Sequence, residues 1–413
     1  MGTPANLHSV SLSSPTAPPA AGGPTRVLEV VGNAIVGGME NCVLRLIEQL
    51  PRAQFAVTVL CPCESRFTDR LRALDVDVLT AAMPDDPPWA SIMTTCALVR
   101  AGGIDVLHAH MPNAHLLAGL VGKLCGKPVI ATVHSRHVTP MDLEVHRLAG
   151  THLSVVCRHS HLHALSMGVD AAQLSCIPNG VDTQVFRPRD GRHGDGGDDD
   201  LRRHFGLAEG DPLIGFVGRL SPEKGPEVFL RAALLLRATL PRARFVLVGD
   251  GPLRASVQQF IERFGLGDAV LPAGVRDDMP AVWRQLDVLV NTSQSEAMPL
   301  ALMEAMASGL PVVASHVGGV PDLVDSGATG WLTGPRDAEA VAHHLAQLFQ
   351  TPGLAARMGA QARARAVARF ELADSVRRTA ALLAQLAARG SGLRAAIGAV
   401  PAARRSANAK LTP

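Results

Sequence analysis

Residues 295–314 read SEAMPLALMEAMASGLPVVA, and this stretch decides the class of fold. Pro299 suits the first turn of a helix, where its missing N–H costs nothing. Gly309 suits the end of that helix, and the apolar run that follows Pro311 reads as a strand. The stretch therefore predicts a helix followed by a buried strand, which is one unit of an α/β fold.

Outward from this unit, short apolar runs alternate with helical patterns along most of the chain. Strands that run almost wholly apolar and are separated by helices indicate parallel sheets covered on both faces. We predict strands at residues 27–31, 56–60, 76–79, 106–109, 129–134, 153–156, 213–217, 244–248, 269–271, 288–291 and 312–314. We expect an α/β protein with two doubly wound domains, whose ligands bind beyond the carboxyl ends of the strands in a cleft between them.

The alternation breaks once, at residues 187–200, which read RPRDGRHGDGGDDD. A charged, glycine-rich segment of this kind buries little apolar surface, so it reads as a linker or a surface loop. We therefore divide the chain into a disordered leader (1–24), a first domain (25–182), a linker (183–212), a second domain (213–368), a helix (369–389) and a basic tail (390–413).

Composition excludes several classes of protein. The chain has 413 residues, of which 47% are hydrophobic and 3% aromatic, with no Tyr and a net charge of +2. Neither a base-stacking surface nor a charge-driven nucleic-acid site is expected from this composition. The seven cysteines form no Cys-x-x-Cys pair, which favours free thiols in a reducing compartment. Because the leader lacks a signal pattern and no run reaches roughly 18 apolar residues, we expect a cytoplasmic protein.

Two glutamates flank the start of the helix in the opening stretch. Glu296 lies just ahead of it, and the free backbone N–H groups around Met298–Leu300 predict an anion site. Glu304 lies inside the helix on an apolar side, where a carboxylate is costly unless it is paired. A pair of sugar hydroxyls, such as those of a ribose, would satisfy it.

A second cluster of charge follows the strand at 213–217. Gly218 ends this strand, and Arg219 and Lys224 lie on the loop before a helix that starts near Pro226. A helix start disfavours cations by roughly 0.3–1 kcal/mol, so a purely structural role explains Lys224 poorly. Two cations at this place could neutralise a diphosphate leaving group without a metal ion.

The first domain offers a glycine pair and a histidine. Gly37 and Gly38 precede a helix, which lets the backbone approach a phosphate or a sugar closely. His134 closes the strand at 129–134 and is expected at the rim of the cleft. His108 and His110 end a neighbouring strand, but His-x-His is a weak metal signal, so no metal site is predicted.

These residues together resemble the retaining glycosyltransferase family 4 of GT-B fold, also called glycosyl transferases group 1. The resemblance rests on the Glu-x7-Glu pair of Glu296 and Glu304, the Glu-Ala-Met-Ala-x-Gly-x-Pro-Val run, Gly218-Arg219, Lys224-Gly225, Gly37-Gly38-x-Glu40, His134 and Pro178-Asn179-Gly180-Val181-Asp182. It spans about residues 26 to 388. The opening Gly-Gly-Met-Glu-Asn is similar to sugar transferases of bacterial exopolysaccharide systems.

The resemblance implies a role for each matching position in binding a nucleotide-diphosphate sugar. It implies that Glu304 holds the ribose hydroxyls and that Arg219 and Lys224 bind the diphosphate. It also implies that the last helix crosses back onto the first domain. The remaining implied contacts are the backbone amides around Met298, Pro299 and Leu300 and at Gly38 with phosphate and sugar, Arg276 beside the base, Glu296 with the transferred sugar, and His134 near the reacting centre.

The resemblance further implies a UDP-sugar or a GDP-sugar as donor, no metal cofactor, and a glycan or lipid-linked acceptor in cell-surface polysaccharide synthesis. A lipid-linked acceptor would require peripheral contact at the inner membrane surface, to which the basic tail could add roughly 1 kcal/mol per cation. One departure is Ala297, which replaces the glycine most often found after the first Glu. Two alternatives remain open at this point: a nucleotide-sugar epimerase or phosphorylase of the same fold, and a non-catalytic sugar-nucleotide binder.

Overall fold

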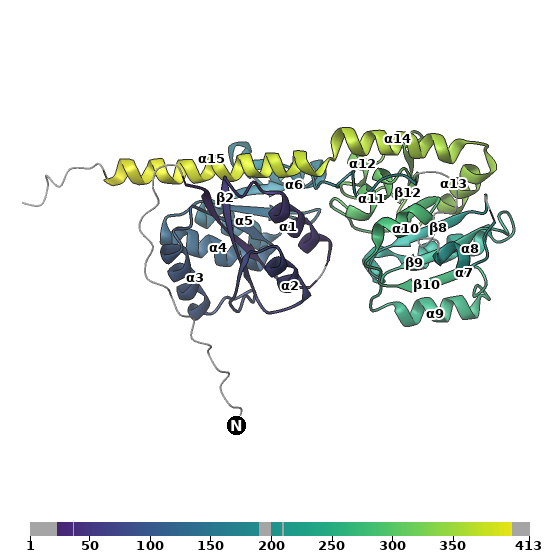
Figure 1. Cartoon of the computed structure of the whole chain (residues 1–413), viewed down its shortest axis with the longest axis horizontal. Helices are drawn as coiled ribbons and strands as arrows, with labels where there is room; N and C mark the ends of the chain where they lie inside the picture. The colour runs from purple at the N-terminus through teal and green to yellow at the C-terminus, as the bar shows by residue number, and fades with distance from the viewer. Residues whose placement is uncertain (1–22, 36, 190–199, 209, 399–413) are drawn as a thin grey trace, which may run out of the picture.

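A computed structural model describes residues 23–35, 37–189, 200–208 and 210–398 of the chain. The leader up to residue 22, the middle of the expected linker and the tail from residue 399 lie outside the described residues. Two α/β domains lie side by side, and a long helix extends from one along the other (Figure 1). Among the described residues, no helix is both long and apolar enough to cross a membrane.

The first domain is a parallel sheet with the strand order β3-β2-β1-β4-β5-β6-β7. Its order reverses between β1 and β4, which is where doubly wound sheets bind ligands. The strands are β1 (Thr25–Val31), β2 (Phe55–Cys61), β3 (Asp77–Thr80), β4 (Val106–His110), β5 (Val129–Val133), β6 (His152–Val155) and β7 (Leu174–Cys176). The helices are α1 (Gly38–Gln49), α2 (Arg66–Ala73), α3 (Trp89–Ala101), α4 (Pro112–Cys125), α5 (Pro140–Ala149) and α6 (Arg158–Ser166).

The second domain repeats this plan with the strand order β10-β9-β8-β11-β12-β13, again parallel throughout. Its strands are β8 (Leu213–Val217), β9 (Arg244–Val248), β10 (Val270–Gly274), β11 (Val288–Asn291), β12 (Val312–Ser315) and β13 (Gly330–Thr333). Its helices are α7 (Asp200–His204), α8 (Pro226–Leu236), α9 (Arg254–Arg263), α10 (Met279–Gln285), α11 (Leu300–Ala307), α12 (Val320–Leu323), α13 (Ala338–Gln350) and α14 (Leu354–Arg369).

The expected α/β class and parallel sheets are confirmed, and every predicted strand overlaps an observed one. The sequence does not predict β7, which has three residues, or β13, which starts at a glycine. Continuous apolar strands bury both faces of each sheet, as in Val27, Leu28 and Val30 of β1, which have no exposed surface.

Two segments differ from the expected division of the chain. Residues 200–208 do not behave as a solvated linker, because Leu201 and Arg202 are buried on the second domain. Arg202 donates hydrogen bonds to the carbonyl oxygens of Gln285 and Asp211. The final helix, α15 (Leu372–Gly398), is longer than the expected 369–389 and lies against β1, β4 and α1 of the first domain (Figure 1).

Candidate active site

Glu296 and Lys224 lie on separate loops of the second domain and meet in the structure. Nζ of Lys224 donates to Oε1 of Glu296 at 2.6 Å, and Oγ of Ser293 donates to the same oxygen at 2.7 Å. Gly225 adopts a left-handed turn (φ 63°), and a Cβ there would lie 2.5 Å from the carbonyl oxygen of Thr292. The two loops therefore pack closely, and the buried Glu296 carboxylate forms a charge-assisted hydrogen bond.

The loop that carries Lys224 also presents Gly218 and Arg219 at the carboxyl end of β8. A Cβ at Gly249, on the neighbouring loop after β9, would lie 2.0 Å from the carbonyl oxygen of Gly218. Arg219 is exposed, whereas Lys224 is half-buried. The edge of the second sheet thus offers two cations, one of which is already paired with Glu296.

A glycine pair that sequence reasoning missed supports the Glu296 loop. A Cβ at Gly318 would lie 1.8 Å from the carbonyl oxygen of Glu296, and a Cβ at Gly319 would lie 1.9 Å from that of Ala297. Gly318 also has a φ of 50°. Both glycines follow β12, and paired glycines after a strand and before a helix are the signal that could have identified them.

Ala297 fits its position without backbone strain. In the described part of the chain, the non-glycine residues with a positive φ are Asp75, Met111 and Arg336. Because Ala297 is not among them, a side chain at this place needs no left-handed conformation. The residue lines a cavity between the domains, so its methyl group shapes the space beside Glu296.

Glu304 already has two hydrogen-bond partners for its buried carboxylate. Nη2 of Arg45, on α1 of the first domain, donates to Oε1 at 2.7 Å, and Nε1 of Trp283 donates to Oε2 at 3.2 Å. Burial raises the pKa of Glu304 above its ordinary value, and the positive charge of Arg45 acts against this rise. The sequence predicts that this carboxylate needs partners, but it does not indicate Arg45, which lies 259 positions earlier.

The start of α11 faces the first domain. Pro299 is its N-cap residue and Leu300 its first helical residue, one position later than the sequence suggests. Nδ2 of Asn179 donates to the carbonyl oxygen of Met298 at 3.1 Å. This hydrogen bond joins the helix start to the chain just after the first sheet.

Gly37 and Gly38 lie at the start of α1, with Gly37 as the N-cap residue. Gly37 has no side chain with which to cap this helix, and the carboxylate of Glu40 accepts backbone hydrogen bonds from Gly37 and from Glu40 itself. Gly38 is exposed, and a Cβ there would meet no atom within 4 Å. A Cβ at Gly37 would lie 2.8 Å from Oε2 of Glu40.

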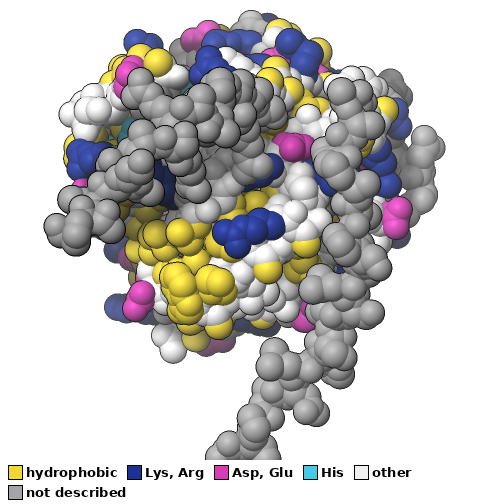
Figure 2. Space-filling view, turned by 90° about the vertical axis from the view of Figure 1, so that its left-hand side faces the viewer, with side chains coloured by type: hydrophobic (Ala, Val, Ile, Leu, Met, Phe, Trp, Pro, Cys, Tyr) yellow, Lys and Arg dark blue, Asp and Glu magenta, His cyan; other side chains and the backbone are white. Residues whose placement is uncertain are grey.

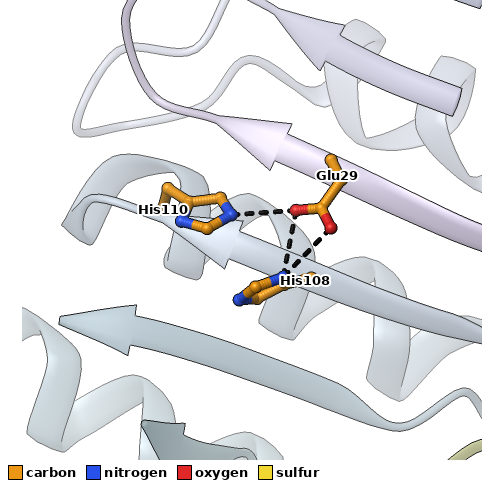
Figure 3. Close-up of side chains that lie close together, drawn as sticks. All are labelled: Glu29, His108 and His110. Atoms are coloured by element: carbon orange, nitrogen blue, oxygen red, sulfur yellow. Dashed lines mark hydrogen bonds and ion pairs between the residues drawn. The ribbon is translucent and has the colours of Figure 1, made fainter. Parts of the chain in front are cut away.

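His134 follows β5 and lies beside a buried group of polar side chains. Its Nε2 is 3.0 Å from Nδ1 of His110. His110 and His108 both contact the carboxylate of Glu29 across the β1–β4 strand pair (Figure 3). The sequence places both histidines near His134 but does not indicate Glu29, since a glutamate inside an apolar strand carries no pattern of its own.

A cavity of about 390 Å³ separates the two groups of candidate residues. Its lining from the first domain is His134, Ser135, Arg136, His137 and Thr139, and from the second domain it is Ser295, Glu296 and Ala297. Arg276 is not part of this lining. It lies on the loop after β10, where its Nε donates to Oδ1 of Asp278 at 2.7 Å. The structure therefore brings His134 and Glu296 to one cavity, and Lys224 reaches it through its hydrogen bond to Glu296.

Comparison with known proteins assigns the chain to a family. Residues 197–365 match the family model described as Glycosyl transferases group 1, and residues 36–185 match Glycosyltransferase Family 4. A 2-deoxystreptamine N-acetyl-D-glucosaminyltransferase from Streptomyces fradiae is 30% identical over 392 residues, which cover 82% of this chain and 91% of that protein. The chain belongs to the family 4 glycosyltransferases. It transfers a sugar from a nucleotide-sugar donor.

A second relative and a solved structure support the same family and fold. The UDP-Gal:alpha-D-GlcNAc-diphosphoundecaprenol alpha-1,3-galactosyltransferase of Escherichia coli is 28% identical over 335 residues, covering 76% of this glycosyltransferase and 85% of that enzyme. The crystal structure of Anabaena Alr3699/HepE in complex with UDP-glucose has a TM-score of 0.77 at 21% identity, covering 87% and 99% of the two chains. The expected GT-B arrangement of two Rossmann-like domains is thus confirmed.

Proposed function

We propose that this glycosyltransferase transfers its sugar with retention of anomeric configuration, from a UDP-sugar and without a metal ion. The observation that carries this proposal is that Glu296, which faces His134 across the interdomain cavity, pairs with Lys224 at 2.6 Å. A cation, a carboxylate and an imidazole around one cavity are the groups that a charged leaving group and a sugar would need.

The donor would lie along the second domain. Glu304 would bind the ribose hydroxyls, because its carboxylate is buried and already accepts hydrogen bonds from Arg45 of the first domain and from Trp283. Arg219, Lys224 and the first amides of α11 would bind the diphosphate, since all three are positive and lie at the carboxyl edge of the second sheet. Gly38 at the start of α1 would approach the phosphates from the first domain.

The chemistry would occur on one face of the sugar. The bond from C1 to the diphosphate breaks, and its electron pair goes to the β-phosphate oxygen. The acceptor oxygen bonds to C1 on the same face, and its proton passes to that phosphate oxygen. Lys224 would stabilise the growing negative charge, and Glu296 would hold the sugar. Electrostatic stabilisation of this kind is usually the largest contribution to catalysis.

The choice of UDP rests on relatives. The name of the Escherichia coli relative gives UDP-Gal as donor, and the Anabaena structure holds UDP-glucose. Arg276 is the implied base contact, and its guanidinium is hydrogen-bonded to Asp278. It would therefore stack beside the base and not form hydrogen bonds with the polar atoms of the base. Stacking suits uracil and guanine alike, which is why the relatives and not the site favour UDP.

We further propose a lipid-linked acceptor for cell-surface polysaccharide, held at a membrane surface by the first domain. The Escherichia coli relative is named for a diphosphoundecaprenol acceptor. Figure 2 views the end of the molecule formed by the first domain, where hydrophobic side chains gather beside a basic one. The exposed hydrophobic residues of the neighbouring helices α3 and α4 are Trp89, Met93, Leu120 and Leu124, and we call them the α3–α4 apolar surface. Exposed apolar residues next to cations suit the interface of an anionic membrane.

One experiment tests the nucleotide and the stereochemistry together. We expect UDP to raise the Tm of the protein more than GDP does, because a bound ligand stabilises the folded state. With a UDP-sugar of α configuration and a diphosphoundecaprenol-linked sugar acceptor, NMR of the product should show an α linkage. A β linkage would exclude same-face transfer, and inversion at C2 of the donor without acceptor would indicate an epimerase.

A further inference from the structure

A buried network of hydrogen bonds ends at His134. We use the name histidine network for Thr132, His108, Glu29, His110 and His134. Nε2 of His108 is 2.7 Å from Oγ1 of Thr132, and its Nδ1 is 3.0 Å from Oε2 of Glu29. Nε2 of His110 is 2.8 Å from the same carboxylate oxygen (Figure 3). The members come from β1, β4, β5 and the residue directly after β5, so the parallel sheet fixes their order.

The bonds determine which nitrogen carries each proton. An ionised carboxylate only accepts hydrogen bonds, so Nε2 of His110 must donate to Glu29. A neutral His110 then has a lone pair on Nδ1, which can only accept a hydrogen bond, and Nε2 of His134 at 3.0 Å must be the donor. His134 therefore carries its proton on Nε2 and a lone pair on Nδ1.

The pKa values agree with these assignments. Burial alone would raise the pKa of Glu29, but the charges of His108 and His110 and their hydrogen bonds outweigh it and lower the pKa to about 2. Burial and the neighbouring His108 lower the pKa of His110 to about 4. Burial also lowers the pKa of His134 well below its ordinary value. At neutral pH the carboxylate is ionised and both of these imidazoles are neutral.

We propose that Glu29 and His110 are positioning residues for His134. They fix the tautomer and the ring orientation of its imidazole, so that Nδ1 is a permanent hydrogen-bond acceptor on the wall of the interdomain cavity. Within the described part of the chain, Nδ1 of His134 has no hydrogen-bond partner. Since His134 lines the cavity opposite Glu296, the lone pair is available to a hydroxyl group of a bound sugar. This proposal rests on the proposed function, which places His134 near the reacting centre.

The network also has the composition of a metal site, and the two interpretations are distinguishable. Donor atoms of Glu29, His108 and His110 all lie within 4.8 Å of one another. Histidine binds a metal ion through a nitrogen that carries no proton. In the proposed network, by contrast, Nδ1 of His108 and Nε2 of His110 carry the protons that they donate to Glu29. Nδ1 of His108 and Nε2 of His110 are therefore protonated in the hydrogen-bonded network and deprotonated in a metal site.

The test is nitrogen NMR of the full-length protein labelled with ¹⁵N-histidine, with assignments from His134→Ala and His110→Gln. At neutral pH we expect the His134 signals of a neutral ring protonated on Nε2, both without ligand and with UDP. A charged ring, a proton on Nδ1, or a stoichiometric metal ion found by elemental analysis of the purified protein would overturn the proposal. This measurement on the unmodified protein does not depend on any variant folding.

Glu29→Gln tests the effect on catalysis. An amide can donate as well as accept, so it no longer dictates the direction of the bonds. We expect mixed His134 tautomers and a fall in kcat on the order of 10- to 100-fold, with little change in the KM for the donor. The tautomer remaining fixed in this variant, or kcat remaining unchanged while the tautomer is lost, would contradict the proposal.

The first domain offers a matched control for loss of stability. Nδ1 of His115 pairs with Oδ1 of the buried Asp142 at 2.9 Å, and its Nε2 lies 2.9 Å from Oγ1 of Thr151. None of these residues lines the interdomain cavity. His115→Gln should therefore destabilise the domain in a similar way and leave both the His134 signals and kcat unchanged. A native kcat in His134→Ala would refute the proposed role of His134 itself, independently of the NMR result.

Discussion

Nη2 of Arg45 lies 2.7 Å from Oε1 of Glu304, and this ion pair joins the first domain to the second. The two side chains are 20% and 10% exposed, so water screens the pair only weakly. Under the proposed function, Glu304 binds the ribose of the donor. The ion pair therefore occupies the place that the nucleoside needs, and the donor must either displace Arg45 or share the carboxylate with it.

Replacement of Arg45 should affect the free protein more than its nucleotide complex. Arg45→Met leaves a buried carboxylate without its charge partner, which costs on the order of 3 kcal/mol. We expect a lower Tm without ligand and a larger rise of Tm with UDP than in the unmodified protein, because ribose hydroxyls restore the missing hydrogen bonds. Arg52→Met is the control, since Arg52 and Asp75 form an exposed pair. Weaker UDP binding by Arg45→Met would instead show that Arg45 contacts the nucleotide.

Lys224→Ala should reduce kcat about 10²-fold or more, because it removes a cation from the site of the leaving diphosphate. Among the described residues, the substitution also leaves the Glu296 carboxylate with Ser293 as its remaining side-chain partner. Steady-state kinetics with a UDP-sugar measures the effect. Arg231→Ala is the matched control, since Arg231 pairs with Glu227 on the exposed side of α8. Similar kcat values for the two variants would remove Lys224 from the mechanism.

Chelation should leave the rate of transfer nearly unchanged. Arg219, Lys224 and the start of α11 supply positive charge where many transferases use a divalent ion. Initial rates measured after dialysis against EDTA, with and without added Mn²⁺ or Mg²⁺, test this expectation. A rate that depends strictly on Mn²⁺ would contradict the proposed metal-independent transfer.

The histidine network should make the first domain sensitive to acid. The pKa of His110 is about 4 in the folded protein against an ordinary value of 6.5, so its stabilising effect is complete above about pH 6.5 and is lost as the pH falls towards 4. For Glu29 the loss lies lower, between 4.5 and about 2. Urea unfolding of the protein and of His110→Gln at several pH values should show a stability difference that shrinks below about pH 6.5. A difference independent of pH would exclude this linkage.

The α3–α4 apolar surface should bind anionic membranes. Trp89 and Leu124 are 67% and 53% exposed, and burial of such side chains contributes about 1.5–3 kcal/mol each. We expect the protein to sediment with vesicles of phosphatidylcholine and phosphatidylglycerol, and the double variant Trp89→Ser/Leu124→Ser to lose most of this binding. Leu235→Ser, on α8 of the second domain, is the control. Equal binding by both variants would place the membrane contact elsewhere.

The sequence by itself determined the two parallel sheets, the order of their strands along the chain and the family. Apolar runs and the Glu296–Glu304 spacing are formed by residues close together in the sequence, so they can be recognised without the structure. The sequence predicts the domain boundary less well. The charged segment 187–200 is followed directly by Leu201 and Arg202, which are buried on the second domain.

Only the tertiary structure decided which side chains meet. Arg45 and Glu304 lie 259 positions apart, and Glu29 and His110 lie 81 apart. Their contacts depend on strand order and on how the two domains pack. No pattern of residues along the sequence reveals strand order or domain packing. The parallel sheet converts distant residues into neighbours, so the partners of each charged group, and hence its protonation state, are properties of the fold.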